Sequence, residues 1–155
     1  GLLDYDFTGW DVSTITHMPA LFASANFTGD VSNWDVSQVV DMSEMFNSAS
    51  AFNGDLSAWD VSSVESMFAM FYRAYAFNGD LSSWETTSLT NMKQMFDQAT
   101  TFNQPIGGFD VSNVTNMSYA FRQAYQFNQP LADWDVANVT NMQRTFENAR
   151  AFNQD

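Results

Sequence analysis

Residues 52–76 read FNGDLSAWDVSSVESMFAMFYRAYA, and residues 77–84 resume the same phrase as FNGDLSSW. The phrase returns along the whole chain, which places six aromatic residues at one equivalent position: Trp10, Trp34, Trp59, Trp84, Phe109 and Trp134. The first spacing in this set is 24 residues and every later one is 25. A fixed period of about 20 to 50 residues is typical of solenoids and propellers, in which each repeat buries its apolar face against the next.

Three further apolar columns follow the same period. They consist of Phe22, Phe46, Phe71, Phe96, Phe121 and Phe146; Phe27, Phe52, Phe77, Phe102, Phe127 and Phe152; and Met18, Met42, Met67, Met92, Met117 and Met142. The columns predict a core built by stacking equivalent side chains, because one repeat alone buries too little apolar surface to offset the entropy of ordering it. An aromatic groove for a cofactor is the alternative interpretation.

Local spacing predicts one strand and one helix in each repeat. In residues 31–37 the apolar residues Val31, Trp34 and Val36 are interrupted by polar ones, which indicates a short strand with one buried face. Residues 39–49, VVDMSEMFNSA, have apolar side chains at helical spacing. A propeller blade needs four strands, for which the repeat is too short. We therefore expect an α/β repeat solenoid of about six coils, with one short parallel strand and one short helix per coil.

The repeat boundaries define a single domain over residues 1–155. The expected coils are about 3–26, 27–51, 52–76, 77–101, 102–126 and 127–151, with a partial coil at 152–155. Since the sequence begins and ends within a repeat, we expect it to be part of a longer array.

The composition restricts the classes of partner. The net charge is −13 with only five Lys and Arg, so the chain should repel nucleic acid and anionic lipid and attract basic partners. There is no cysteine for a disulfide or a thiolate metal site. No apolar run has membrane length, so direct membrane insertion is not expected. His17 is the one histidine and no catalytic set surrounds it in sequence, so we do not expect an enzyme.

These motifs resemble two known repeats. The spacing of Val31, Trp34 and Val36 is similar to the L-x-x-L-x-L core of leucine-rich repeats. The phrase FNxxLxxWDVSxVTNMxxMFxxAxx resembles the 25/26-residue repeat of BspA-like bacterial surface proteins, which mycoplasma surface proteins and lipoproteins carry as a domain of unknown function. The resemblance covers nearly the whole chain. It implies a leucine-rich-repeat-like right-handed superhelix in secreted or cell-surface proteins that function in adhesion and protein binding.

Acidic residues also form columns. The first acidic column is expected on the exposed strand face and contains Asp11, Asp35, Asp60, Glu85, Asp110 and Asp135. It is a candidate binding surface for a protein or glycan. The alternative is a ladder of aspartates that bond to the serines two residues later, with no ligand.

A second acidic set lies in the turns at Asp30, Asp55 and Asp80, preceded by Asp6. These carboxylates could hold calcium weakly, although Pro105 and Pro130 replace the ligand in later coils. No other cofactor is expected.

Asparagines occupy two kinds of position. Asn53, Asn78, Asn103 and Asn128 recur in the turn and are expected to form a structural ladder by bonding neighbouring backbone groups. Asn26, Asn113, Asn116 and Asn138 lie in N-x-S/T patterns and are possible glycosylation sites.

Two functions remain open from the sequence. In the first, the chain is a non-enzymatic cell-surface or secreted module that binds a protein or glycan through the first acidic column. In the second, it is a structural segment of an extracellular filament, stalk or surface layer that associates with itself through uncapped ends.

Overall fold

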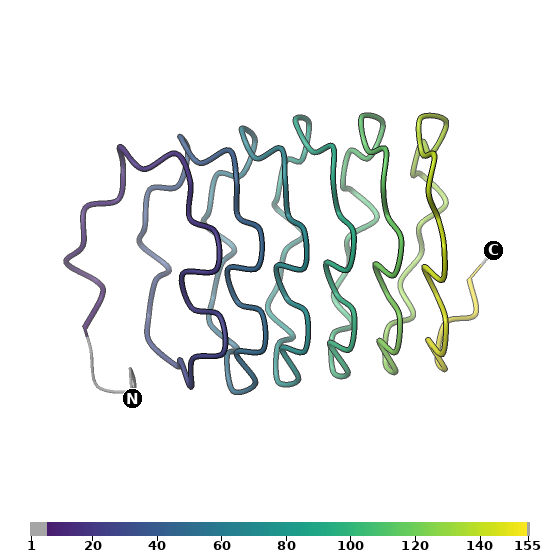
Figure 1. The fold of residues 1–155 in the computed structure, drawn as a ribbon, viewed down its shortest axis with the longest axis horizontal. Helices are drawn as coiled ribbons and strands as arrows, with labels where there is room; N and C mark the ends of the chain where they lie inside the picture. The colour runs from purple at the N-terminus through teal and green to yellow at the C-terminus, as the bar shows by residue number, and fades with distance from the viewer. Residues whose placement is uncertain (1–5, 155) are drawn as a thin grey trace.

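The computed structural model describes residues 6–154. The chain winds into successive coils that stand side by side, from the N-terminal coil at one end of the stack to the C-terminal coil at the other (Figure 1). Backbone hydrogen bonds join neighbouring coils between residues 23 to 26 positions apart, as from Glu44 N to Phe68 O at 2.7 Å and from Glu65 N to Val40 O at 2.8 Å. One coil therefore corresponds to one sequence repeat.

The coils contain almost no regular secondary structure. No residue of 6–154 is helical, and the only strand pairing in this range is a set of isolated parallel bridges that link His17, Asp41, Ser66, Asn91, Asn116 and Asn141 in order. The prediction of an α/β, leucine-rich-repeat-like right-handed solenoid with one strand and one helix per coil is therefore wrong. Without a helix, this part of the chain also has none that could cross a membrane.

Residues 39–49 form consecutive turns where a helix was predicted. From Met45 to Ala49 every second N–H donates to the carbonyl three residues earlier, as Met45 does to Met42 at 3.2 Å. The N–H groups of Met42, Glu44, Phe46 and Ser48 donate to the next coil, and that of Val40 donates to the preceding coil. Glu44 and Ser48 adopt positive φ angles of 59° and 57°, which a right-handed helix does not allow. The segment gives half of its donors to the neighbouring coil, and a helix would use them within itself.

The spacing of the coils gives the physical reason. Phe46 and Phe71 occupy this segment in neighbouring coils, and their ring centroids are 5.7 Å apart. Packed helices need interaxial distances of about 8–10 Å. At this spacing, the segment for which a helix was predicted has no room for a helix in each coil. Met42, Met45, Phe46 and Ala49 are nevertheless all buried in the core, although no helix places them there.

The predicted strand over residues 31–36 is also absent. Turns close from Trp34 N to Val31 O at 3.2 Å and from Val39 N to Val36 O at 2.9 Å. Asp35 adds a side-chain bond to Ser37, which bends the backbone where the strand would continue. The isolated bridge at Asp41 lies after the predicted strand.

Left-handed backbone conformations recur in each coil. Twelve residues other than glycine in the described range have φ between 51° and 62°, two per coil, and no described glycine does. These residues are Ala20, Ser24, Glu44, Ser48, Ala69, Arg73, Gln94, Gln98, Tyr119, Gln123, Arg144 and Asn148. Because left-handed conformations are costly for residues with a Cβ atom, the coil-to-coil bonds that they allow must compensate.

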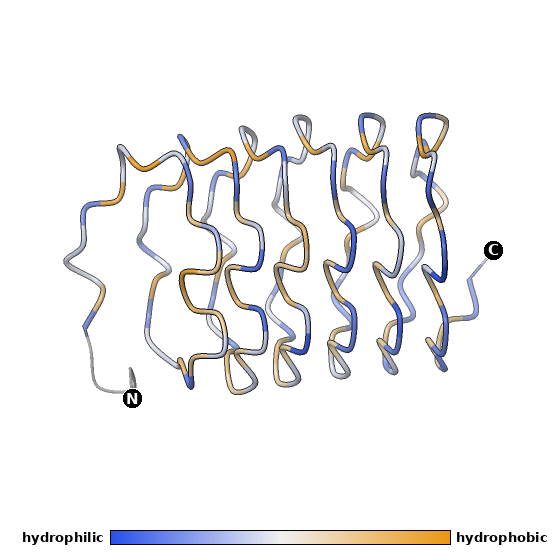
Figure 2. Ribbon diagram, in the orientation of Figure 1, coloured by the Kyte–Doolittle hydropathy of each residue, from blue (hydrophilic) through white to orange (hydrophobic). Residues whose placement is uncertain are grey.

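Apolar side chains fill the interior. Apolar and polar segments alternate around the coils of the ribbon (Figure 2). Met45 and Phe27 are both buried and belong to one continuous core cluster. Phe46, near the end of one coil, stacks on Phe52, at the start of the next, at 3.9 Å and 5°. Phe52 then stacks on Phe77 of the next coil at 5.8 Å and 4°. The two phenylalanine columns thus form a double aromatic stack along the core.

The tryptophans add hydrogen bonds to this stack. The indole N–H of Trp84 donates to the carbonyl of Leu56 in the preceding coil at 2.9 Å, and Trp34, Trp59 and Trp134 repeat the bond. Phe109 stacks on Trp84 at 6.3 Å but has no N–H to donate. Each indole therefore ties its ring to the neighbouring coil as well as filling the core.

The indole bond predicts the effect of two reciprocal substitutions. Trp84→Phe should lower the free energy of unfolding by about 1–2 kcal/mol, because the Leu56 carbonyl loses its indole partner. Phe109→Trp should raise it by up to about 1 kcal/mol by supplying an indole N–H to the Leu81 carbonyl. Urea unfolding measures both changes, and a Trp84→Phe protein as stable as the parent would contradict this role.

The positive φ angles predict opposite outcomes at two glutamines. Gln123 has a φ of 57°, so Gln123→Gly should stabilise the fold by about 0.5–1 kcal/mol and Gln123→Val should destabilise it by more. Gln126 is exposed and has no positive φ, so Gln126→Gly should instead cost about 0.5–1 kcal/mol. Thermal unfolding of the three variants tests the sign, and equal effects of the two glycines would be inconsistent with strain at Gln123.

Candidate functional site

The first acidic column lies on the surface. All six of its residues are exposed: Asp11, Asp35, Asp60, Glu85, Asp110 and Asp135. The column occurs in every coil because the repeat places one acid directly after the tryptophan position. Since the tryptophan points into the core, the next side chain points outward. The column therefore projects one carboxylate per coil along the stack.

Most of these carboxylates bond within their own turn. Asp60 Oδ1 accepts the backbone N–H of Ser62 at 3.0 Å and its hydroxyl at 2.7 Å. Asp11, Asp35 and Asp110 repeat both bonds with the serine two residues later, and Asp135 accepts the N–H of Ala137. These bonds close the turns, and all of them use the Oδ1 atom of the carboxylate.

The serine bonds favour the charged form of four aspartates in the column. Hydrogen bonds from the Ser62 hydroxyl and then its backbone N–H lower the pKa of Asp60, and the serines at the same place in their turns act likewise on Asp11, Asp35 and Asp110. For Asp35 the neighbouring Asp60 and Asp11 carboxylates raise the pKa, but by less than the serine bonds lower it. These four aspartates are thus ionised at neutral pH despite their mutual repulsion.

One coil departs from this pattern. Glu85 replaces aspartate, and no hydrogen bond of its side chain occurs within residues 6–154. Thr86 replaces the usual valine after the acid, is buried, and donates its hydroxyl to the Asp110 carbonyl at 3.1 Å. The free carboxylate of Glu85 sets this coil apart from the others of the column.

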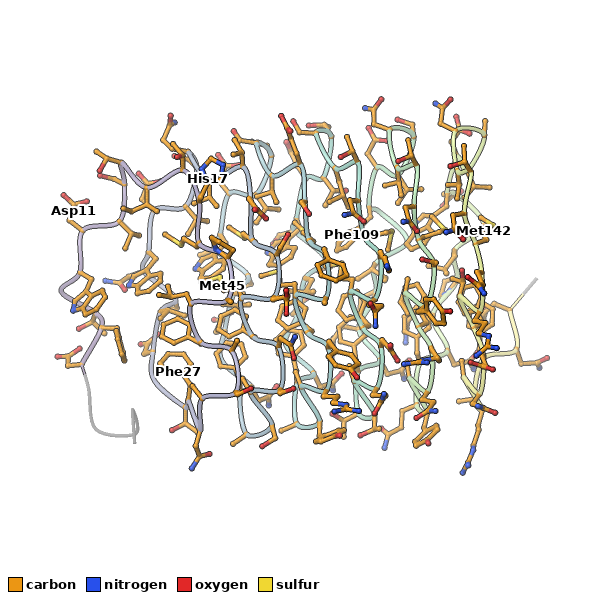
Figure 3. All side chains as sticks on the ribbon, viewed as in Figure 1. Asp11, His17, Phe27, Met45, Phe109 and Met142 are labelled. Carbon is orange, nitrogen blue, oxygen red and sulfur yellow. The ribbon has the colours of Figure 1, made fainter. Side chains whose placement is uncertain are left out.

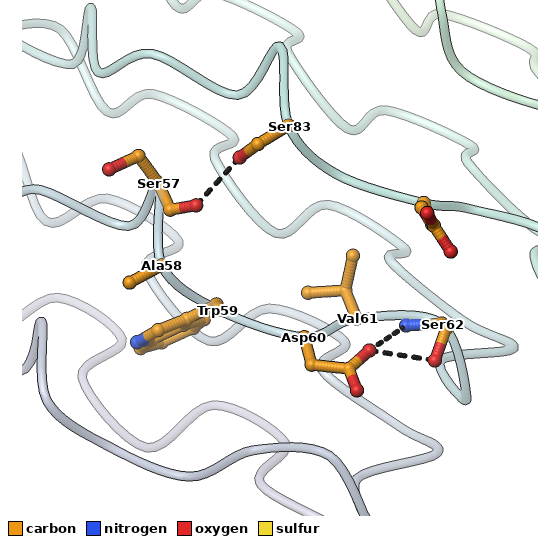
Figure 4. A pocket seen from close by; sticks show the side chains of 8 residues that line it. Ser57, Ala58, Trp59, Asp60, Val61, Ser62 and Ser83 are labelled. Carbon is orange, nitrogen blue, oxygen red and sulfur yellow. Dashed lines mark hydrogen bonds between the residues drawn. The ribbon is translucent and has the colours of Figure 1, made fainter.

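Glu85 borders an open polar hollow of about 360 Å³, which Trp59, Asp60, Ser62 and Ser83 also line (Figure 4). The Ser83 hydroxyl closes one wall by donating to the Ser57 carbonyl at 2.6 Å. The hollow presents two carboxylates, one fixed by its turn and one free. This arrangement suits a cationic side chain better than an apolar ligand.

The second acidic set does not assemble a metal centre. Within residues 6–154, no three His, Asp or Glu side chains come together in a way that could hold a metal ion. Asp30, Asp55 and Asp80 are exposed and one coil apart, and each bonds to the serine two residues later, as Asp55 does to Ser57. The predicted calcium ligands therefore act as turn acceptors in this structure.

The turn asparagines lie in register across four coils. Asn53 Oδ1 accepts the backbone N–H of Asn78 at 2.8 Å, and Asn78, Asn103 and Asn128 pass the same bond on toward Asn153. Gln129 adds a bond from its Nε2 to Asn103 Oδ1 at 3.0 Å. The amides thus run along the stack as a continuous hydrogen-bonded ladder.

The four possible glycosylation sites differ in their surroundings. Asn26 is exposed, and Asn116 is half-buried and accepts bonds from Ser118. The Nδ2 atoms of Asn113 and Asn138 donate to the carbonyls of the preceding coil at 3.0 and 2.8 Å. A glycan on either of these last two would replace a donor that the stack uses.

The cations occupy a different segment of the coil from the first acidic column. Arg73, Lys93, Arg122, Arg144 and Arg150 all lie in the consecutive turns or directly after them. Arg150 lies over the Tyr125 ring at 4.6 Å and Lys93 over the Phe68 ring at 5.6 Å, each pair one repeat apart. Our sequence reasoning missed these pairs. The 25-residue offset between a cation and an aromatic residue was the signal that could have shown them.

A buried ion pair belongs to the same segment. Arg122 contacts Asp97 through two hydrogen bonds, Nε to Oδ1 at 3.0 Å and Nη2 to Oδ2 at 2.8 Å. Asp97 is fully buried, so the pair satisfies a carboxylate that the core would otherwise exclude. Arg122 is therefore engaged in this ion pair. The other four cations, Arg73, Lys93, Arg144 and Arg150, are exposed or half-exposed.

The geometry defines a helix-free stack of coils with charged side chains in columns along it. The chain belongs to the family described as Mycoplasma protein of unknown function, DUF285, which matches residues 3–104 and again residues 79–155. This membership confirms the resemblance to the mycoplasma-type repeat domain. A search of curated proteins found no match to the chain.

The lowered pKa values predict loss of stability in acid. The folded state holds the pKa of Asp11, Asp35, Asp60 and Asp110 below the ordinary value of 3.8, so the unfolded chain binds protons first as the pH falls. The stabilisation is complete well above pH 3.8 and disappears as the pH drops through the folded pKa values. The melting temperature should therefore fall between neutral pH and pH 3.

A quadruple Asp→Asn variant at these positions is the control. Asparagine keeps the Oδ1 acceptor but does not titrate, so the acid-induced fall in melting temperature should be smaller in the variant than in the parent. Equal falls in both proteins would assign the acid sensitivity to other carboxylates.

Proposed function

We propose that this chain is a non-enzymatic cell-surface or secreted module that binds a basic protein surface through the first acidic column. The observation that supports the proposal most directly is that the first acidic column runs through every coil with no Lys or Arg in it. All five Lys and Arg lie in the consecutive turns or directly after them, whereas the column is purely acidic and exposed. The localisation is part of the proposal and rests on the resemblance to bacterial surface proteins.

The spacing of the column suits a multivalent contact. The rings directly before the acids are 6.3–6.4 Å apart in neighbouring coils, as in Trp84–Phe109 and Trp10–Trp34, so we expect the carboxylates to recur at a similar interval along the stack. The serine bonds hold four of the six carboxylates, Asp11, Asp35, Asp60 and Asp110, in place before a partner arrives, which reduces the entropy cost of binding. Glu85 and the polar hollow beside it give the column one distinct position, where we place the insertion of a Lys or Arg side chain.

A second candidate function is structural self-association. Large apolar side chains are exposed mainly at the two ends of the stack, among them Trp10 and Met142. End-to-end association would cover them and extend the stack, as a filament or surface layer requires.

Charge neutralisation on the column tests the binding function. The variant Asp35→Asn, Asp60→Asn, Asp110→Asn keeps the turn bonds and removes three charges, and it should bind a lysine-rich peptide roughly tenfold or more weakly than the parent. The affinity of the parent should also fall with added salt. Titration calorimetry at several salt concentrations measures both effects.

The matched control removes three charges outside the column, as Glu44→Gln, Glu65→Gln and Glu147→Gln. It should weaken peptide binding much less than the column variant. Equal losses in the two triple variants would show that only net charge matters, and they would overturn the role of the column.

A further inference from the structure

One side of the stack carries aromatic residues at its surface. We define the turn face as residues 66–76, 91–101 and 116–126, which contain the consecutive turns of three neighbouring coils. Within residues 27–126, every aromatic side chain that is not buried lies on this face: Phe68, Tyr72, Tyr75, Tyr119 and Tyr125. The other aromatic residues of that range, such as Phe27 and Phe109, belong to the core (Figure 3).

The turn face is continuous across its three coils. Arg73 N donates to Asp97 O at 2.9 Å, and Gln98 N donates to Arg122 O at 2.7 Å, so the segments lie side by side. Each of the three coils has a described coil on both sides. The surface that these segments present therefore belongs to the middle of the stack.

The turn face is positively charged in an acidic chain. It contains three of the five Lys and Arg, namely Arg73, Lys93 and Arg122, and one of the 18 Asp and Glu, Asp97. Asp97 is fully buried and accepts two hydrogen bonds from Arg122. The turn face therefore presents cations to solvent and no carboxylate.

Two of these cations have no acidic partner. Within residues 6–154, neither Arg73 nor Lys93 forms an ion pair, although the chain has many more acids than cations. Arg73 lies over the Tyr72 ring at 4.9 Å, and Lys93 lies over the Phe68 ring at 5.6 Å. An aromatic ring attracts a cation without neutralising its charge, so both cations can still bind a carboxylate from another molecule.

The rings favour a protein partner over a stacked base. A cation covers one face of Phe68, Tyr72 and Tyr119, whereas single-stranded nucleic acid binds by stacking its bases on free ring faces. Tyrosine and arginine are enriched in protein interfaces, where they often contribute most of the binding energy. Tyr75 is 43% exposed and offers the most accessible ring of the turn face.

We propose that the turn face binds an acidic segment of a partner protein, whose carboxylates pair with Arg73 and Lys93 and whose apolar side chains pack on Tyr75. This contact goes beyond the function proposed above, because it uses a different surface and a partner of opposite charge. The aromatic rings hold both cations in place before the partner binds, which reduces the entropy cost of binding.

A peptide rich in glutamate and leucine is the probe for this surface. The double variant Arg73→Gln, Lys93→Gln should bind it roughly fivefold or more weakly than the parent chain, because two pairing charges are lost. Tyr75→Ala should also weaken binding, since the exposed ring is removed. Titration calorimetry measures the affinities, and thermal unfolding checks that each variant remains folded.

The matched control is Arg144→Gln, Arg150→Gln, which removes two cations outside the turn face. It changes the net charge by the same amount and should weaken binding of the glutamate-rich peptide much less. The variant Asp35→Asn, Asp60→Asn, Asp110→Asn should bind this peptide at least as tightly as the parent. Failure of the acidic column and failure of the turn face can therefore be distinguished.

Four results would overturn the proposal. If the parent chain does not bind the glutamate-rich peptide, the turn face does not take an acidic segment. If the two double variants lose affinity equally, only net charge matters. If oligothymidylate binds through Arg73 and Lys93 more tightly than the peptide, the partner is a nucleic acid. If the parent chain self-associates in sedimentation velocity and Arg73→Gln, Lys93→Gln abolishes this, the occupant is a second copy of the chain.

Discussion

The structure depends on one constraint, the backbone hydrogen bonds that run from each coil to the next. In the consecutive turns every second N–H donates to the neighbouring coil, as Phe46 does to Met70 at 2.9 Å. These bonds fix the coil spacing, which in turn stacks the phenylalanines at 5.6–5.7 Å across coils, as in Phe46–Phe71 and Phe71–Phe96. Neither the core columns nor the acidic column could stay in line if the spacing varied from coil to coil.

The same constraint connects the interior to the surface. The tryptophan that donates to the preceding coil is followed by the acid of the column, so the indole bond also positions the carboxylate beside it. Where one coil departs from the repeat sequence, its core and its surface change together. Thr86 is buried and bonds across to Asp110, while Glu85 next to it is left free at the hollow. The repeated residues build the stack, and substitutions such as Glu85 and Thr86 make one coil different from the others.

Glycine shows why local structure was misjudged. Positive φ angles are most common at glycine, but in the described range they occur only at other residues, such as Glu44 and Gln98. Gly54 has an ordinary φ, and a Cβ there would lie 2.7 Å from the Phe52 ring. The apolar spacing of Met42, Met45, Phe46 and Ala49 fits a helix and the observed turns equally well, because both place these four side chains inward.

The sequence by itself determined the repeat, the identity of the core columns, the acidic column and the family, because each of these depends only on which residue recurs at which position. Only the tertiary structure decided the backbone path. A helix satisfies its N–H groups alone, whereas a turn segment such as residues 39–49 needs a neighbouring coil to accept half of them. That partner lies 24 or 25 residues away, beyond the reach of any local pattern. For the same reason the pairing of Asp97 with Arg122 became visible only when the coils were stacked.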